Sequence, residues 1–392
     1  MTEYRIANKA DFQAIVDFSN EVFSRTVDEF GVAQYDHAFF QTLLPKVYQD
    51  ATTATWHRIA EEDGRICGCV ATFPLQYQVG TYSLRCAGIG TVGVSHAHRG
   101  KGYMKRLMHD SMAAAEQGGY DFALLGGLRQ RYAHYGFELA GIDPVFIFTA
   151  DNARYLFGKD VAQGYTFQTV THSDETLLDL MYAQNENALQ HVCRSREKLY
   201  DTLLSFGSVP IAFFDVTGEY AGYLLARANG AVWEFRPLQP EHALRVLADY
   251  TRAGAYEQLT IHRVGAHETA LLRTLSDGCE DCALRRCDSI RIFRYETTLR
   301  AYLALRAMTT PLPDGSLVLG FANGEVLQMT VSDGKSTVVA TEREPLYTLS
   351  HADAVKLLFG PFTLFSDCGY LLPAAARAWF PLPFALNAAD DI

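Results

Sequence analysis

One strand–turn–helix segment constrains the fold of this chain more than any other part of the sequence. The apolar run Ile89–Val94 predicts a buried strand, and the run from Met104 to about Gln117 predicts a helix. Between them stands Arg99-Gly100-Lys101-Gly102, with two glycines and two cations. A helix N-terminus presents unpaired N–H groups, and glycines let the backbone approach an anion closely. The turn therefore predicts a phosphate-binding loop rather than a solvated surface turn.

Strand and helix patterns alternate along residues 1–148. Apolar side chains recur on one helical face between Asp11 and Phe23, and residues 56–80 predict a hairpin that turns at Asp63-Gly64. Phe122–Leu125 reads as a short buried strand. Such alternation predicts an α/β fold, in which helices pack on a parallel or mixed sheet.

A faint internal repeat follows this first domain. Residues 63–73 resemble residues 217–227, and residues 107–125 resemble residues 244–262. The second copy has "EFRPLQPEHA" where the first has the glycine loop. We therefore predict a duplicated domain that has lost the loop and binds no cofactor.

The pattern changes near residue 295. Asn323-Gly324 predicts a hairpin turn, Asp333-Gly334 introduces a third strand, and Ser350 begins a helix. These signals predict a small α+β domain. The predicted domains are residues 1–148, 149–293 and 294–392.

Charge and cysteine content exclude several classes of function. The 392 residues carry a net charge of −11 and no basic block, so we expect no nucleic-acid partner. No apolar run approaches the ~18 residues of a membrane span, and the first residues contain no apolar signal segment, so we expect a cytoplasmic chain with reduced thiols. Cys279 and Cys282 form a C-x-x-C, but a second such pair is missing, which favours free cysteines over a metal site.

The loop has neither the G-x-x-x-x-G-K-S/T nor the G-x-G-x-x-G pattern of nucleotide-binding loops. It resembles the pyrophosphate loop of the GNAT superfamily of N-acyltransferases, Arg/Gln-x-x-Gly-x-Gly/Ala, and departs from it at Met104. Downstream, Tyr132, Gly136 and Phe137 resemble the Tyr-x-x-x-Gly-Phe element of that superfamily.

The whole chain resembles the "enhanced intracellular survival" (Eis) family. That resemblance implies tandem GNAT-like sheets with flanking helices and a sterol-carrier-like third domain. It also implies acetyl transfer from acetyl-CoA to primary amines of a small cationic molecule, often an aminoglycoside, and assembly into a homo-oligomer, typically a hexamer.

The resemblance assigns roles to individual residues. Tyr132 is expected to be the general acid and the C-terminal carboxylate of Ile392 the general base. The residues expected to bind acetyl-CoA are Val92, Gly93, Val94, Arg99, Gly100, Lys101, Gly102, Tyr103 and Met104. Asp390 and Asp391 are either a site for cationic acceptors or part of a solvated acidic tail.

The tail Trp379–Ile392 is too apolar to lie in water, so we predict that Trp379, Phe380 and Phe384 anchor it on the body of the protein. Two other functions remain open from the sequence. One is a regulatory protein that binds acyl-CoA or lipid without turnover. The other is a protein-lysine acetyltransferase.

Overall fold

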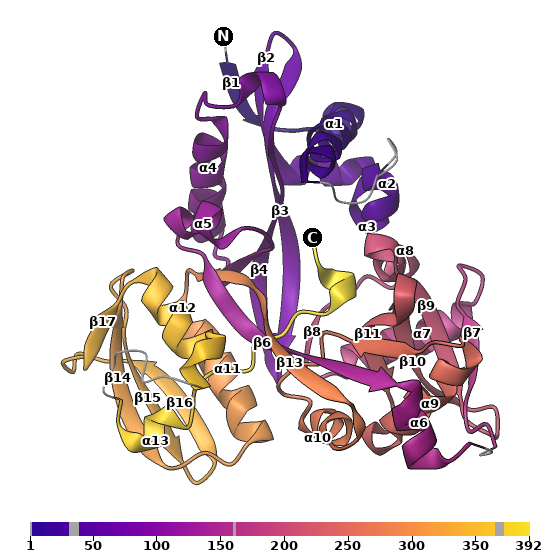
Figure 1. Cartoon of the computed structure of the whole chain (residues 1–392). Coiled ribbons are helices and arrows are strands. Elements are labelled where there is room, and N and C mark those ends of the chain that lie inside the picture. Colours follow the sequence, from indigo (N-terminus) through magenta and orange to yellow (C-terminus); the bar gives the residue numbers. More distant parts are fainter. Residues whose placement is uncertain (1, 31–38, 160–161, 365–371) are drawn as a thin grey trace.

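The computed structural model describes residues 2–30, 39–159, 162–364 and 372–392. It has three lobes, which Figure 1 shows meeting below the long strands β3 (Arg65–Val79) and β4 (Tyr82–Val94). A sheet of 13 strands runs through the first two lobes, and a sheet of 4 strands lies in the third. The predicted α/β class, with mixed sheets and flanking helices, is confirmed.

The first lobe is built on a long antiparallel hairpin. β3 and β4 pair from Gly68↔Val94 to Val79↔Tyr82, so β4 begins well before the predicted strand Ile89–Val94. The predicted turn at Asp63-Gly64 is confirmed, and its two residues have positive φ angles of 51° and 75°. The other elements of this lobe are β1 (Thr2–Ile6), α1 (Phe12–Phe30), α2 (Phe39–Leu43), α3 (Pro45–Tyr48), β2 (His57–Glu62), α4 (Tyr103–Gln117), β5 (Phe122–Leu125) and α5 (Arg129–Tyr132).

The second lobe repeats the core of the first. β2, β3 and β4 pair antiparallel, and β5 then pairs parallel to β4 after helix α4. In the same order, β9, β10 and β11 pair antiparallel, and β12 pairs parallel to β11 after helix α9. The elements of this lobe are β6 (Glu138–Thr149), α6 (Ala150–Phe157), β7 (Thr166–Thr169), α7 (Glu175–Glu186), β8 (Gln190–Val192), α8 (Leu199–Leu204), β9 (Val209–Phe214), β10 (Tyr220–Arg227), β11 (Ala231–Pro237), α9 (Ala243–Ala253), β12 (Gln258–Ile261), α10 (Thr269–Gly278) and β13 (Asp281–Ile292).

Two strands join the lobes into one sheet. β13 pairs with β5 through Ser289–Ile292 and with β6 along most of its length. The end of β6, Phe146–Thr149, pairs with β12 of the second lobe. The predicted boundary at residue 148 therefore falls inside a strand that belongs to both lobes.

The third lobe has the predicted strand order. β14 and β15 form a hairpin around Asn323-Gly324, and β16 follows the turn at Asp333-Gly334. The Ser350 side chain accepts a hydrogen bond from the Asp353 amide (3.2 Å) and caps α12, as predicted. The elements are α11 (Tyr295–Thr309), β14 (Gly315–Phe321), β15 (Val326–Ser332), β16 (Lys335–Ala340), β17 (Tyr347–Leu349), α12 (His351–Phe359) and α13 (Ala374–Arg377).

The C-terminal tail folds back from the third lobe to the large sheet, and its end lies beside β4 in Figure 1. Trp379, Phe380 and Phe384 are buried, which confirms their predicted role as anchors. The Trp379 indole N–H donates to the Pro313 carbonyl at 3.0 Å. The tail thus connects all three lobes.

Two other findings concern the described part of the chain. Its helices are all too short or too polar to cross a bilayer. Its cysteines form no disulfide, and Cys279, Cys282 and Cys287 are free thiols as predicted. Cys368 lies outside the described residues.

Candidate active site

The first feature of the site is a gap between β4 and β5. These parallel strands pair only where Cys86–Gly88 faces Phe122–Leu124. Beyond Gly88, β4 continues to Val94 while β5 ends at Leu125, so the edge of β4 leaves its neighbour. An extended ligand can hydrogen-bond to such an edge as an added strand. The predicted cofactor residues Val92, Gly93 and Val94 lie on this free stretch.

A β-bulge between β3 and β4 lies next to this gap. The register between β3 and β4 shifts between Cys69 and Ala71, and Thr91 has a positive φ of 49°. A β-branched residue in that conformation is strained and needs support from its surroundings. The Tyr48 hydroxyl supplies it, because it hydrogen-bonds to the Thr91 hydroxyl and lies 3.3 Å from Nε2 of His57.

The second feature is the glycine loop at the start of α4. Gly100 and Gly102 have φ angles of 82° and 84°, which only glycine adopts without strain, and the space beside both is open. The amides of Gly100, Gly102 and Met104 have no hydrogen-bond partner among the described residues. They are therefore available to a phosphate at the positive end of the helix.

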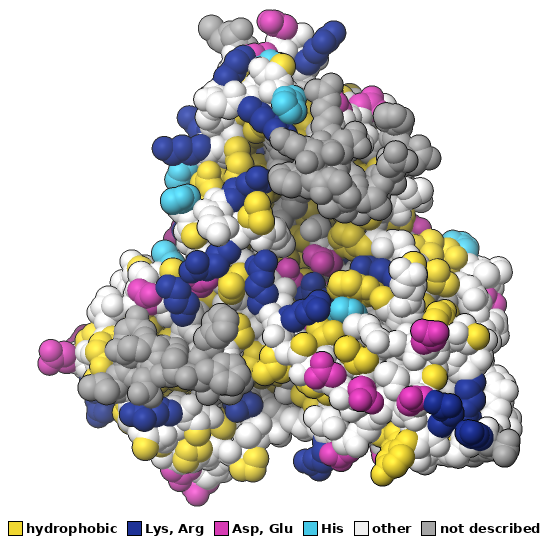
Figure 2. Space-filling model, viewed as in Figure 1, with side chains coloured by type: hydrophobic (Ala, Val, Ile, Leu, Met, Phe, Trp, Pro, Cys, Tyr) yellow, Lys and Arg dark blue, Asp and Glu magenta, His cyan; other side chains and the backbone are white. Residues whose placement is uncertain are grey.

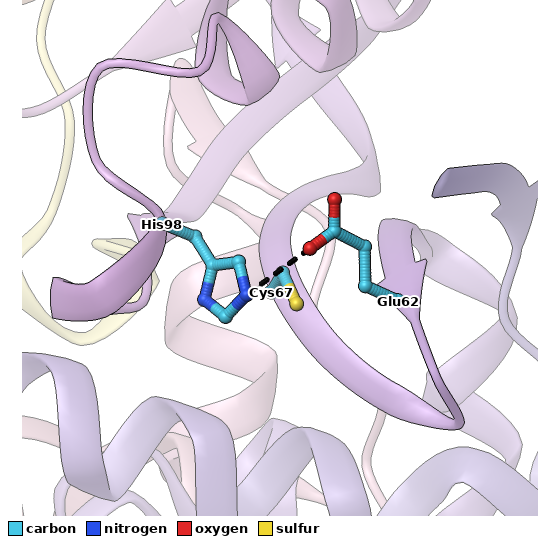
Figure 3. Close-up of side chains that lie close together, drawn as sticks. All are labelled: Glu62, Cys67 and His98. Carbon is cyan, nitrogen blue, oxygen red and sulfur yellow. Dashed lines mark ion pairs between the residues drawn. The ribbon is translucent and has the colours of Figure 1, made fainter. Parts of the chain in front are cut away.

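Glu62 ties this loop to the β2–β3 hairpin (Figure 3). Its carboxylate lies 3.0 Å from Nζ of Lys101 and 3.2 Å from Nε2 of His98, and it accepts a hydrogen bond from the Tyr103 hydroxyl. The hydrogen bond from Tyr103 is the largest cause that lowers the pKa of Glu62 to about 2. Lys101 and the Tyr103 hydroxyl thus anchor the loop to Glu62. Arg99 and the backbone amides remain available to a ligand.

Glu62, Cys67 and His98 also bring three metal-type donor atoms within 4.8 Å of one another. The Cys67 thiol donates to the Arg65 carbonyl at 3.4 Å, and Nδ1 of His98 lies 2.7 Å from the Ser95 hydroxyl. Because Lys101 already neutralises the Glu62 carboxylate, anchoring of the loop accounts for this cluster without a metal.

Tyr132 is the last residue of α5, the short helix that follows β5, and it belongs to the same buried cluster as residues of α4. It packs with Leu125 and Phe137, and a side chain on Gly127 would collide with its ring. Burial raises the pKa of Tyr132 above its ordinary value. The phenol therefore stays protonated at neutral pH, as a proton donor must.

The end of the chain lies against β4 where β5 leaves it. A Cβ on Gly88 would be 2.3 Å from Cδ1 of Ile392, and a Cβ on Gly90 would be 3.5 Å from the Ile392 carboxyl carbon. Phe73 of β3 lies beside both glycines. The two glycines therefore make room for the terminus, and Ile392 lies where β5 has left β4.

Basic side chains hold the tail in this position. Nζ of Lys46 donates to the carbonyls of Ala389 (2.7 Å) and Asp391 (2.6 Å). Arg194 binds both Asp390 (2.9 Å) and Glu234 (3.0 Å), and these three side chains are almost completely buried. The tail is thus fastened to the first lobe by Lys46 and to the second by Arg194.

The acidic residues at the end of the tail are not solvated. Asp390 is only 3% exposed and pairs with Arg194, and Asp391 lies 3.5 Å from Arg263. The alternative of a solvated acidic tail is therefore wrong for Asp390. Because Arg194 already balances the charge of Asp390, this carboxylate would add little to the binding of a cationic acceptor.

A second carboxylate shares Arg263. Asp288 of β13 lies 2.8 Å from Arg263. A Cβ on Gly126, directly after β5, would lie 3.7 Å from Oδ1 of Asp288 and 4.0 Å from Oδ1 of Asp391. Burial, reinforced by the charge of Asp391, raises the pKa of Asp288 to about 7. Two carboxylates that compete for one guanidinium thus border the site.

Beside Ile392 lies a cavity of about 200 Å³, which we call the acceptor cavity. Its described walls come from the first lobe, from residues 192–202 of the second and from the tail. The lining residues are Lys46, Val47, Trp56, Phe73, Pro74, Leu75, Val192, Cys193, Arg194, Ser195, Lys198, Thr202, Asp390 and Ile392.

Residues 3–140 match the family described as "Acetyltransferase (GNAT) domain". The first lobe is a GNAT acetyltransferase domain. The match contains the glycine loop, the bulged strand and Tyr132, and it makes the chain an enzyme of the N-acetyltransferase class. The search of curated proteins found no match to this chain.

Solved structures share the three-lobed fold over their full length. A "Probable N-Acyltransferase" from Enterococcus faecalis V583 has a TM-score of 0.69 and 17% identity, with 99% of each chain covered. A GCN5-related N-acetyltransferase from Kribbella flavida has a TM-score of 0.67 and 15% identity, covering 99% of this chain and 98% of that chain. Eis1 from Mycobacterium abscessus has a TM-score of 0.66 and 15% identity, with 100% of both chains covered. At sequence identities of 15–17%, these similarities show a shared fold only.

Proposed function

We propose that this protein transfers the acetyl group of acetyl-CoA to a primary amine of a small molecule. One observation carries the proposal: the carboxyl group of Ile392 lies against Gly90, on the stretch of β4 that β5 has left. A carboxylate in that position meets an amine arriving at the gap, and it borders a cavity of about 200 Å³.

The residues present fit acetyl-CoA. The free amides from Gly100 to Met104 suit its pyrophosphate, and the open space beside Gly100 and Gly102 lets the phosphates approach the backbone. The free edge of β4 at Val92 and Val94 suits the pantetheine amides. When bound, acetyl-CoA supplies an activated acyl group.

Three groups of the chain would carry the transfer. Alkylammonium groups have a pKa near ~10.4, so the Ile392 carboxylate takes a proton from the acceptor amine, directly or through water. Amides of β4 donate hydrogen bonds where negative charge develops. Tyr132, kept protonated by its burial, donates a proton to the departing sulfur.

Other parts of this proposal come from the likeness to the Eis family. They are an aminoglycoside-like cationic acceptor, assembly into a homo-oligomer such as a hexamer, a cytoplasmic location, and a sterol-carrier-like third lobe spanning 294–392. The sequence "EFRPLQPEHA", which stands where the first copy has its glycine loop, supports a second lobe, 149–293, that binds no acetyl-CoA.

A C-terminal extension tests the proposal. Three glycines added after Ile392 move the carboxylate away from β4 but leave Lys46 and Arg194 in place. We expect acetyl-CoA-dependent turnover, measured by thiol release, to fall ~10²–10⁴-fold, the usual effect of removing a general base. Acetyl-CoA affinity in calorimetry should not change. The same three glycines at the N-terminus provide the control.

Two results would count against the proposal. Full activity of the extended protein would mean that another carboxylate is the base. Stabilisation of the wild-type protein by acetyl-CoA, without turnover on aminoglycosides, polyamines, simple amines or lysine peptides, would favour a binding protein instead.

A further inference from the structure

The described walls of the acceptor cavity are mostly apolar. Trp56, Phe73, Leu75 and Val192 line it, and the side chain of Ile392 lies between them and β4. The rings of Trp56 and Phe73 meet edge to face, with centroids 5.9 Å apart. These side chains form a rigid apolar pocket directly beside the proposed base.

The volume of the cavity limits what it holds. An apolar protein cavity of ~150 Å³ takes up benzene, whereas sites for drug-sized ligands are typically ~300–1,000 Å³. At about 200 Å³, this cavity fits one ring or a branched chain with a short arm. Most of a ligand of several linked sugar rings would have to lie outside this cavity.

The charged groups of the cavity are mainly basic. Lys46, Arg194 and Lys198 line it, and Figure 2 shows lysine and arginine side chains gathered where the lobes meet. Its carboxylates, among the described residues, are Asp390, which pairs with Arg194, and the terminus itself. Arg194 also pairs with Glu234, and Lys198 pairs with Asp50, so these two basic side chains are already matched. A polycation would therefore find a single unmatched carboxylate, that of the terminus, for its several ammonium groups.

We propose that the acceptor is a compact monoamine, with one primary amino group on an aromatic or branched aliphatic body. This inference rests on the proposed acetyl transfer, and it departs from the aminoglycoside-like acceptor that the likeness to the Eis family supports. The apolar body fills the space between Trp56 and Leu75, and the amino group points to the Ile392 carboxylate.

The same walls favour the chemistry. Apolar surroundings disfavour a protonated amine. An ammonium group that enters this apolar pocket therefore gives up its proton to Ile392 more readily than it would in water. A single amino group loses its charge in this way, whereas a polyamine would keep others charged in the same cavity.

The test is a comparison of amines at fixed acetyl-CoA, with thiol release and the mass of the product as readouts. The panel is 2-phenylethylamine, 3-methylbutylamine, ethanolamine, spermidine, kanamycin and a lysine peptide. We expect kcat/KM for the two apolar monoamines to exceed that for ethanolamine by roughly 100-fold, since buried hydrocarbon groups discriminate by ~10–200-fold each.

Two variants link this preference to the cavity. Trp56→Ala should lower kcat/KM for 2-phenylethylamine about tenfold, through KM, and leave ethanolamine almost unchanged. Leu75→Glu should reduce the preference for apolar amines and improve spermidine. Tyr155→Ala is the matched control, because Tyr155 on α6 is 90% exposed.

The outcomes separate the two proposals. Faster turnover of kanamycin, spermidine or the lysine peptide than of the apolar amines overturns the compact monoamine but leaves acetyl transfer standing. An unchanged amine preference in Trp56→Ala also overturns it. Absence of turnover with every amine, despite acetyl-CoA binding, contradicts acetyl transfer itself.

Discussion

Replacing Lys46 with methionine should release the end of the chain from the site. The two carbonyls that Lys46 holds, of Ala389 and Asp391, lie 2.7 and 2.6 Å from its Nζ. A hydrogen bond to a charged group contributes ~1.5–3 kcal/mol to stability. When the tail moves out, hydrogen bonds from water to the two carbonyls recover part of this free energy. We therefore expect the docked state to lose about 2–4 kcal/mol, which corresponds to a factor of ~30–1,000 in its population.

Two assays measure this loss. Carboxypeptidase should release Ile392 from Lys46→Met much faster than from the wild-type protein, because the terminus spends more time away from β4. The kcat for acetyl transfer should fall at least about tenfold, while KM for acetyl-CoA stays unchanged, since the glycine loop is untouched. Lys46→Arg keeps the charge and the donors and should retain part of both properties.

Lys335→Met is the control, because Lys335 is an exposed residue of β16 in the third lobe. Thermal unfolding of both variants separates a released tail from a misfolded protein. If folded Lys46→Met resists carboxypeptidase as well as the wild-type protein does, the reasoning is refuted. A kcat of Lys46→Met equal to that of the wild-type protein would refute it as well.

Three further predictions address other parts of the site. Gly90→Ala puts a methyl group 2.6 Å from the Phe73 ring and 3.5 Å from the Ile392 carboxyl carbon, so kcat should collapse and stability should fall by ~1–3 kcal/mol on denaturant unfolding. Glu62→Gln loses the ion pair with Lys101, and calorimetry should record weaker acetyl-CoA binding, with kcat at saturation nearly unchanged. Asp288 keeps its proton in the folded protein up to a pKa of about 7, whereas an unfolded Asp ionises near ~3.9. The folded state therefore binds the extra proton between these values, and the free energy of unfolding falls as pH rises from 4 to 7. That slope should be smaller in Asp288→Asn, and equal slopes would contradict the assignment.

The sequence predicts the first lobe well because its signals are local. The Asp63-Gly64 turn, the Ile89–Val94 strand and the helix predicted from Met104 each depend on a few neighbouring residues. Each is found in the structure, with the strand beginning earlier, at Tyr82, and the helix at Tyr103. The internal repeat is also visible in sequence, since both copies keep the same order of strands around a helix. The sequence does not show that the first two lobes share one sheet through β6 and β13, because strand pairing between distant segments leaves no local pattern.

Most residues around the chain end had no signal in the sequence. Lys46, Arg194, Glu234, Arg263 and Asp288 are far apart in the chain, and each is an ordinary charged residue until the fold brings it to the tail. Gly88 and Gly90 are different, since two glycines within an apolar strand indicate a close approach of another chain segment. This pattern does not name the C-terminus, because nothing local says which segment approaches.

The position of the tail explains what the second lobe contributes without a glycine loop of its own. β11 and β12 pair only at Ala231–Val232, and Arg236 lies further along β11. Arg236 binds Glu268 (2.6 Å) and the tail residue Asn387 (2.5 Å). In the first lobe the corresponding stretch of β4 has no neighbouring strand, whereas here the end of β11 carries an ion pair that also contacts the tail. Glu234 of the same strand completes the buried pair with Arg194 and Asp390. The second lobe thus supplies a set of contacts that direct the end of the chain into the site of its neighbour.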